Sequence, residues 1–372
     1  MSIVLNGDTG ITTPAETVSG AVTAATVTAT GLISGATNYT GFKNRIINGA
    51  MVVNQRATAV TATAYTVDRF SYNAAQTSKA TVSQDTSVYP TGFNSSLKVL
   101  SSSAYAILTG DYFTIEQPIE GLNCIDLAWG TASAANVTLS FWVRSSLTGT
   151  FGGAIYAVGG PLSYPFSYTI SAANTWEQKT VSIAGPTVGT FVTTNATCFT
   201  VCFAIGVGAT YSSTAGSWQS STLRSATGAT SVVGTSGATF YITGVQLEKG
   251  STATSFDYRP YGTELALCQR YYWQTGSPFA GVPAWTYSTT QFGTTLWHPT
   301  TMRTSPTVAS VTATTAYTFY FNAGSTQFNS VTANNTNVFC ADLYATTSGK
   351  TSGQAGFFGI SASGNITVSA EL

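Results

Sequence analysis

Charged side chains are scarce in this chain of 372 residues. Lys, Arg, Asp and Glu together make up 8% of the sequence, against about 25% in an ordinary globular domain. The 14 basic and 14 acidic residues balance, so the formal net charge is zero. A neutral chain has no general electrostatic attraction to nucleic acid or to an anionic membrane, and we expect neither as a partner.

Residues for catalysis are scarce too. His298 is the single histidine, and no G-x-S-x-G motif accompanies it to supply a nucleophile. Glycoside hydrolysis needs paired carboxylates, but in the acidic cluster of Asp111, Glu116 and Glu120 the first two would point to opposite faces of a strand. We expect solvated edge charges there, or a partner for Arg144. The sequence therefore predicts no enzyme and no catalytic residue.

The cysteine count excludes a complete disulfide framework. Five cysteines are scattered along the chain, at positions 124, 198, 202, 268 and 340. Five is an odd number, and no spacing resembles that of a metal site. We expect buried free thiols, no metal, no cofactor, and folding in a reducing cytoplasm.

Export and membrane signals are lacking. The first basic residue is Lys43, so a positively charged leader is absent, and no apolar run approaches the ~20 residues of a membrane span. We therefore expect no signal peptide and no membrane insertion. A chain of extracellular-like composition without an export signal is typical of virion proteins, which are made in the host cytoplasm and released by lysis.

The N-terminal residues 1–43 have few large apolar groups. The run VSGAVTAATVTATGLIS at 18–34 favours extended backbone through its β-branched residues, but it cannot form a core alone. Two interpretations stay open: a flexible arm, or a segment ordered by packing against copies of itself or another protein.

Residues 44–262 predict an antiparallel β-sandwich, of jelly-roll type, because short strand patterns recur between turn signals with almost no helical periodicity. The closing strand is predicted at Phe240–Glu248, where a β-bulge at Gly244 would absorb a change of phase. The other strands are predicted at 96–100, 111–117, 137–144, 153–158, 177–183 and 199–207.

Residues 263–372 predict a short helix followed by a second, smaller β domain. The helix is expected over Thr263–Trp273, with Thr263 as its N-cap and Glu264 in the first turn. Strands are expected at 285–287, 294–297, 307–311, 317–321, 338–343 and 366–369, and an exposed loop at 329–337. The fold class is therefore all-β: an extended arm, a sandwich, and a C-terminal β domain joined by a helix.

Aromatic side chains are the best candidates for ligand binding, because Tyr and Trp rings stack on the apolar faces of sugars. Two stretches, 159–168 and 211–219, are expected to be loops that carry such rings among small polar residues. The four candidate glycan-binding residues are Tyr164, Tyr168, Tyr211 and Trp218. Alternatively, these rings cover the ends of the sandwich or a seam between subunits.

Several stretches, in this order, resemble structural proteins of tailed bacteriophages, namely tail-fibre-like and head-decoration proteins. They are NRIINGAMVVNQR at 44–56, YTVDRF at 65–70, YITGVQLEKG at 241–250, FDYRPYG at 256–262, ELALCQRYY at 264–272 and SAEL at 369–372. The opening IVLNGDTGITTP at 3–14 is similar to the N-terminal arms of such proteins.

The resemblance implies a virion protein, commonly a homotrimer, with a sandwich similar to carbohydrate-binding modules. Many such sandwiches carry a calcium-binding Asp where this chain has Gly244, so we expect no calcium site. The first hypothesis is a tail fibre or receptor-binding protein that attaches the virion to host surface polysaccharide. The alternative is a capsid decoration (head-fibre) protein that stabilises the shell. In both, the arm 1–43 would anchor the protein to other tail or capsid proteins.

Overall fold

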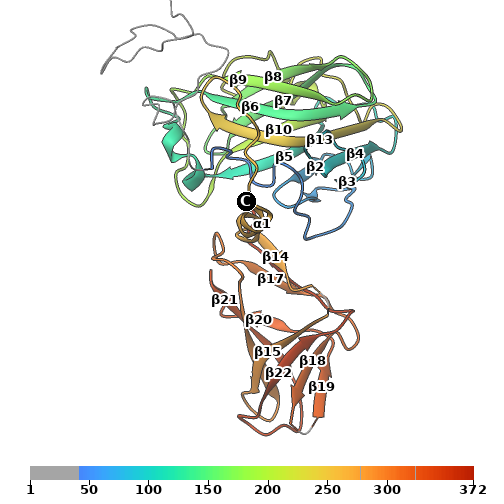
Figure 1. Ribbon diagram of the computed structural model, residues 1–372, viewed down its shortest axis with the longest axis vertical. Coiled ribbons are helices and arrows are strands. Elements are labelled where there is room, and N and C mark those ends of the chain that lie inside the picture. The colour runs from blue at the N-terminus through green and yellow to red at the C-terminus, as the bar shows by residue number, and fades with distance from the viewer. Residues whose placement is uncertain (1–41, 277, 323) are drawn as a thin grey trace, which may run out of the picture. The chain divides into compact units, whose positions relative to one another are not determined.

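The computed structural model describes residues 42–276, 278–322 and 324–372 (Figure 1). The predicted anchoring arm, 1–43, therefore lies outside the described residues except for Phe42 and Lys43. In the described part of the chain, no helix has both the length and the apolar character needed to cross a bilayer.

Two antiparallel sheets form the sandwich, which confirms the predicted fold class (Figure 1). The six-stranded sheet has the order β1 (Ala64–Tyr65), β2 (Ser71–Ala74), β5 (Tyr112–Glu120), β10 (Thr197–Val207), β7 (Gly149–Ala157) and β8 (Ser163–Ile170). The five-stranded sheet has the order β3 (Ala80–Asp85), β4 (Ser96–Ser101), β13 (Thr239–Lys249), β6 (Val137–Ser145) and β9 (Glu177–Ile183). Short pieces complete it: the 3-10 turns Gly121–Asn123, Ile125–Leu127 and Ala209–Tyr211, and the parallel pair β11 (Ser212–Ser213) and β12 (Ser225–Ala226).

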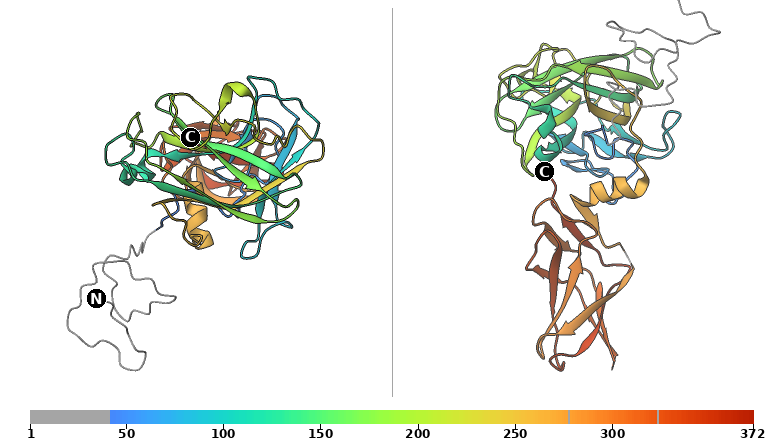
Figure 2. Two further views of the ribbon diagram at one scale, coloured as in Figure 1. Left: turned by 90° about the horizontal axis from the view of Figure 1, so that it is seen from above. Right: turned by 60° about the vertical axis from the view of Figure 1, so that its left-hand side comes forward.

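The core of the sandwich is built from every second side chain of the strands. On β6, Val137, Leu139, Phe141 and Val143 are all fully buried between the sheets, as their period of two predicts. Figure 2 shows the two sheets packed face to face. Along each strand of the six-stranded sheet, every second side chain points into this core, and the side chains between them lie on the outer face of the sheet.

The predicted bulge in the closing strand is confirmed. The register of β13 against β6 shifts between Thr243 and Gln246, and Gly244 between them has φ +61°. A Cβ at Gly244 would lie 2.6 Å from the Phe93 ring. Both the backbone conformation and the close ring require glycine there.

One loop prediction is wrong. The stretch 159–168 was expected to be a loop, but most of it is the edge strand β8, paired with β7. Every second residue from Tyr164 to Ile170 points into the core, and Ser167 and Thr169 between them are exposed, which is a strand pattern. Pro165 obscures that pattern, since proline inside a sheet is confined to edges.

The helix α1 (Tyr261–Gln269) begins and ends earlier than predicted. Pro260 is the N-cap, and its carbonyl accepts hydrogen bonds from the backbone N–H groups of Thr263 (2.9 Å) and Glu264 (3.1 Å). Thr263 is therefore inside the helix rather than its cap. Tyr272 was placed on the helix but belongs to a strand, because it pairs with Ser369.

Two further antiparallel sheets follow α1 and share a hydrophobic core of their own. The three-stranded sheet has the order β14 (Tyr272–Gln274), β23 (Ile366–Ser369) and β17 (Thr307–Ser310). The seven-stranded sheet has the order β19 (Gly324–Phe328), β18 (Tyr317–Phe321), β22 (Ala355–Ile360), β15 (Phe279–Thr286), β16 (Gln291–Trp297), β21 (Cys340–Thr346) and β20 (Thr332–Asn334). The loop expected at 329–337 is thus interrupted by β20.

Three of the six motifs that resemble phage proteins, at 44–56, 65–70 and 369–372, meet at one junction. Glu371 forms ion pairs with Arg69 and with Arg56, the latter at 2.9 Å. Arg56 also approaches Asp68 at 3.4 Å, and the Arg69 guanidinium donates to the carbonyl of Pro118 at 2.9 Å. The buried charges of three motifs therefore neutralise one another.

Helix α1 is attached at the same junction. Arg270 binds Glu120 of β5 at 2.6 Å, and the Tyr271 hydroxyl donates to the same carboxylate. Ile47, Val53, Cys268 and Tyr271 form a small apolar cluster of their own there. The resembling motifs therefore hold the sandwich to the chain that follows it.

The prediction of buried free thiols is confirmed for four of the five cysteines. All five thiols are free, four are buried, and Cys340 is partly exposed. The expected environment of the acids is wrong: Asp111, Glu116 and Glu120 are buried, because each has its own donors on or beside β5. Arg144 pairs with none of them and donates instead to the carbonyl of Asn174 at 2.9 Å.

Candidate functional site

Two of the four candidate aromatic residues lie inside the sandwich. Tyr164 and Tyr168 point inward from β8, with 8% and 6% of their surface exposed. The Tyr168 ring packs edge-on against Phe141 at 5.0 Å between centroids. Stacking on a sugar needs an open ring face, which neither tyrosine presents here.

Trp218 lies in the predicted loop and is partly exposed. Its ring packs edge-on against Trp129, Tyr164 and Phe191, and its indole N–H donates to the carbonyl of Ala184 at 2.6 Å. These contacts make Trp218 part of an aromatic cluster around Trp129.

Tyr211 is separate from that cluster. Its half-buried ring lies edge-on to Tyr112, with centroids 5.3 Å apart, and its backbone carbonyl accepts a hydrogen bond from the N–H of Arg224 at 2.8 Å. Tyr211 therefore borders the outer face of the six-stranded sheet, next to a cleft.

This cleft is a hollow of about 440 Å³ over β2, β5, β10 and β7. It forms because alternate residues of these strands point away from the core: Phe113 and Ile115 of β5 are buried, whereas Tyr112 and Glu116 line the hollow. Leu372 and Tyr65 lie at its border, joined by a hydrogen bond of 2.8 Å from the Tyr65 hydroxyl.

Glu116 is the polar centre of the cleft. Its carboxylate accepts hydrogen bonds from the Asn73 amide (2.9 Å), the Tyr156 hydroxyl (2.8 Å) and the Thr114 hydroxyl (2.7 Å). It also forms an ion pair with Arg224. A carboxylate with four donors is fixed in position.

Arg224 crosses the cleft between two rings. Its guanidinium carbon lies 4.3 Å from the centroid of Tyr112 and 4.9 Å from that of Tyr156. Burial alone would lower the pKa of Arg224, but the neighbouring Glu116 carboxylate and Tyr156 raise it above its ordinary value. Burial, and then Glu116, also raise the pKa of Tyr156, so its phenol is neutral at physiological pH.

The cleft combines the two elements that a sugar site needs. The partly exposed rings of Tyr112 and Tyr156 supply apolar surface, and the guanidinium of Arg224 supplies directed donors. Glu116 is the one carboxylate among the residues that line it. The rings, the guanidinium and the carboxylate together suit the binding of a sugar ring.

The other candidates for chemistry have structural contacts. Asp111 accepts from the Tyr105 hydroxyl at 2.8 Å. The His298 ring contacts the Asn337 carbonyl at 3.1 Å and packs against Trp273, and burial lowers the pKa of His298. Among the described residues, no three His, Cys, Asp or Glu side chains gather as a metal site would require.

Sequence reasoning missed most of the cleft. Tyr112, Thr114 and Glu116 share one parity of β5, opposite Phe113 and Ile115, and this alternation was the available signal. Arg224 follows Glu116 by 108 positions, so no local pattern could have joined the two. The two come together because the segment that leads into β12 lies against the sheet in which β10 pairs with both β5 and β7.

No family model matches this chain, and no curated protein matches it. Part of its backbone is similar to solved structures. The enzymatically active domain of tailspike protein 4 of bacteriophage CBA120 has 14% identity and a TM-score of 0.29, with 56% of this chain and 21% of that one covered. The chain thus spans about a fifth of the tailspike domain.

Two carbohydrate-binding modules have similarly low sequence identity and TM-score to this chain. The module TmCBM61, solved in complex with β-1,4-galactotriose, has 10% identity and a TM-score of 0.30, covering 56% of this chain and 100% of that one. The family 11 module of the cellulosomal cellulase Lic26A-Cel5E of Clostridium thermocellum has 14% identity and a TM-score of 0.26, covering 50% and 91%. The function of this chain is therefore inferred from its own side chains.

Proposed function

We propose that this protein is a bacteriophage virion protein that attaches the particle to host surface glycans, and that it binds them without cleaving them. The observation that carries the binding proposal is the cleft on the six-stranded sheet. There the Tyr112 and Tyr156 rings flank Arg224, which is held by the buried carboxylate of Glu116. The virion assignment is supported by the ordered sequence motifs.

The geometry suits a neutral or weakly acidic sugar chain. Because Glu116 already engages Arg224, the net charge of the pair is zero, and a neutral ligand pays no penalty for entering. The donors that remain on Arg224 can hydrogen-bond to sugar hydroxyl groups, since its guanidinium has more N–H groups than its contacts with Glu116 and Tyr156 use. The amide N–H groups of Asn73 already donate to Glu116 and to Ser71. A hollow of about 440 Å³ is within the usual ~300–1,000 Å³ of small-ligand sites.

A homotrimer would strengthen weak binding at a single cleft, because linked sites raise the effective ligand concentration. Self-association is supported by the low charge of the chain and by exposed aromatic side chains. Tyr320 and Phe357 are 50% and 56% exposed and are directly opposite one another on β18 and β22. Such apolar patches mark association surfaces.

The attachment function is tested by locating the protein on intact virions with an antibody to residues 263–372, viewed by electron microscopy. Label confined to the tail is the expected result. Label spread over the head would replace host attachment by the decoration function, and the cleft would then be assigned to contacts within the shell. Virions without label would contradict both.

The glycan part is tested with the purified full-length protein on an array of bacterial surface polysaccharides and neutral oligosaccharides. We expect binding to a small group of related glycans and no shortening of any of them on prolonged incubation. Release of reducing ends from a bound glycan would contradict the proposal of binding without cleavage.

A further inference from the structure

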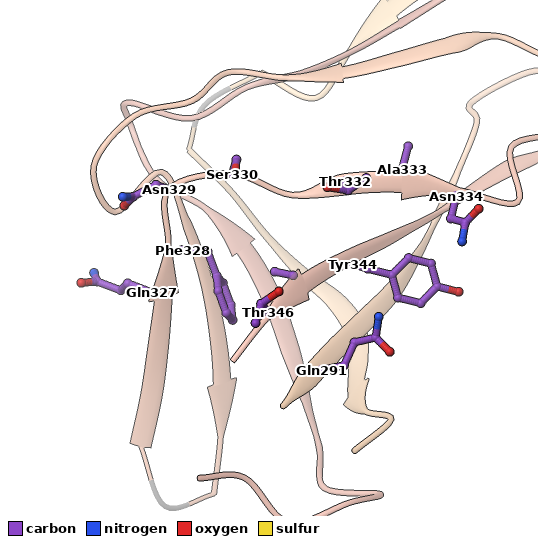
Figure 3. A pocket seen from close by; sticks show the side chains of 11 residues that line it. Gln291, Gln327, Phe328, Asn329, Ser330, Thr332, Ala333, Asn334, Tyr344 and Thr346 are labelled. Atoms are coloured by element: carbon purple, nitrogen blue, oxygen red, sulfur yellow. The ribbon is translucent and has the colours of Figure 1, made fainter. Parts of the chain in front are cut away.

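A second hollow, of about 690 Å³, opens in the seven-stranded sheet (Figure 3). Strands β19 and β20 are opposite edges of that sheet, yet only the link 329–331 joins them along the chain. Seven flat strands would place the edges ~29 Å apart, whereas a link of this length reaches ~14 Å at most. The sheet must therefore curl until its two edges approach each other. The hollow lies between these edges and is lined by β19, β20, β21 and β16.

The lining of this hollow is polar but uncharged. Four carboxamides (Gln291, Gln327, Asn329 and Asn334) and the Tyr344 phenol are joined by small hydroxyl and apolar side chains. None of the eleven lining residues is Asp, Glu, Lys or Arg. A charged ligand would find no counter-ion here, so the lining selects for a neutral one.

Three polar groups gather at one end of the hollow. Figure 3 shows Asn334, Tyr344 and Gln291 close together there, with Phe328 and Thr346 nearer its middle. Within the described chain, the Gln291 carboxamide and the Asn334 side-chain N–H groups make no hydrogen bond to another protein group. These donors and acceptors are available to a ligand.

The Tyr344 ring is held in place by a second tyrosine, Tyr287. It packs on Tyr287 with centroids 5.2 Å apart, and the two hydroxyls are 3.4 Å apart. Tyr287 in turn lies over Gly293, where a Cβ would be 2.1 Å from its ring. Glycine at 293 therefore makes the room that lets Tyr287 support Tyr344.

We propose that this hollow is a second binding site of the protein, for a neutral saccharide. A supported tyrosine ring offers a stacking face, and planar carboxamides hydrogen-bond to neighbouring sugar hydroxyl groups through one donor and one acceptor. The buried Phe328, stacked on Phe292 at 5.4 Å, gives the middle of the hollow an apolar floor. The site is independent of the cleft in the sandwich and does not require the cleft to bind.

The experiment uses the full chain and neutral tetrasaccharides of glucose, galactose, mannose and N-acetylglucosamine as probes, with saturation-transfer NMR as the readout. It starts from Tyr112→Ala, which removes a ring of the cleft, so that any remaining binding reports on other sites. Asn334→Ala and Gln291→Ala are then added together. Asn322→Ala, an exposed carboxamide outside both hollows, is the matched control.

We expect Tyr112→Ala protein to retain binding of at least one probe. The added pair should weaken that affinity at least about tenfold, because each hydrogen bond lost costs about fivefold, and Asn322→Ala should leave it unchanged. The second site is overturned if Tyr112→Ala protein binds no probe, or if the added pair leaves the affinity unchanged. If the pair in the wild-type background removes all binding while Tyr112→Ala removes none, the hollow stands and the cleft proposal fails.

Discussion

At the residue scale, Glu116 shows how a buried charge becomes part of a binding face. It is 5% exposed on the largely buried strand β5, and it is tolerated because four donors satisfy it. The sequence revealed the acid but not its partners, which come from β2, from β7 and from the segment before β12. Its role could therefore be assigned only after the sheet was assembled.

Replacing Glu116 by Gln should destabilise the protein by about 2 kcal/mol, because it leaves the largely buried Arg224 without a counter-charge. Denaturant unfolding would measure the loss. Asp126→Asn, which removes the exposed partner of Arg45, is the control and should cost less than about 1 kcal/mol. Equal losses for the two variants would contradict the role given to the Glu116–Arg224 pair.

The buried tyrosines predict a loss of stability at alkaline pH. Burial, and then the Glu371 carboxylate, raise the pKa of Tyr65 to about 12, and burial raises the pKa of Tyr72 and Tyr168 as well. Because the folded state prefers the protonated phenol, this contribution is complete below the unfolded pKa of 10.0 and is lost as the pH rises above it.

Circular dichroism and tyrosinate absorbance, followed together from pH 9 upward, check this alkaline transition. A group of tyrosines should ionise only as the protein unfolds. Ionisation of every tyrosine near its ordinary pKa, with the fold intact, would show that these phenols are not sequestered.

At the element scale, regular strands were predictable and irregular ones were not. The alternation of β6, the bulge in β13 and the bounds of β18 follow from the spacing of their own apolar residues. Strand β8 was missed because Pro165 interrupts its pattern. Strand β20 was missed because three residues, without a large apolar side chain among them, are too few to show a periodicity. With β8 unrecognised, Tyr164 and Tyr168 were expected to be exposed.

The junction between the sandwich and α1 predicts a second stability effect. Glu371→Gln should destabilise the protein by about 3 kcal/mol, because Arg69 is 1% exposed and would lose its buried counter-charge. Thermal unfolding should show a lower midpoint for the variant, while Asp126→Asn again serves as the surface control. An unchanged midpoint would mean that the buried arginines find other partners.

At the scale of the whole molecule, we propose that the arm anchors the protein and that the described cores stabilise it. Among the described residues, the three apolar clusters are complete without the arm, and the first residue that they include is Ile46. Deleting residues 1–41 should therefore leave the midpoint of thermal unfolding unchanged while abolishing incorporation into virions. A lower midpoint would show that the arm stabilises the fold, and full incorporation would show that it is not the anchor.

The homotrimer is a second prediction at this scale. Sedimentation equilibrium of the full-length protein should give three times the mass of one chain. Phe357→Ser with Tyr320→Ser should shift the protein toward the monomer if the exposed face of β18 and β22 lies at the subunit contact. A wild-type monomer at all concentrations would contradict the avidity argument.

The central claim, that the cleft on the six-stranded sheet holds a glycan, is tested most directly by the Tyr112→Ala variant. Its affinity for the best glycan of the array is compared with that of wild type and of Tyr89→Ala, a tyrosine 42% exposed outside the cleft. Loss of a stacking ring should weaken cleft binding about tenfold or more, with Tyr89→Ala unchanged. Equal affinity of all three proteins for that glycan would contradict the claim.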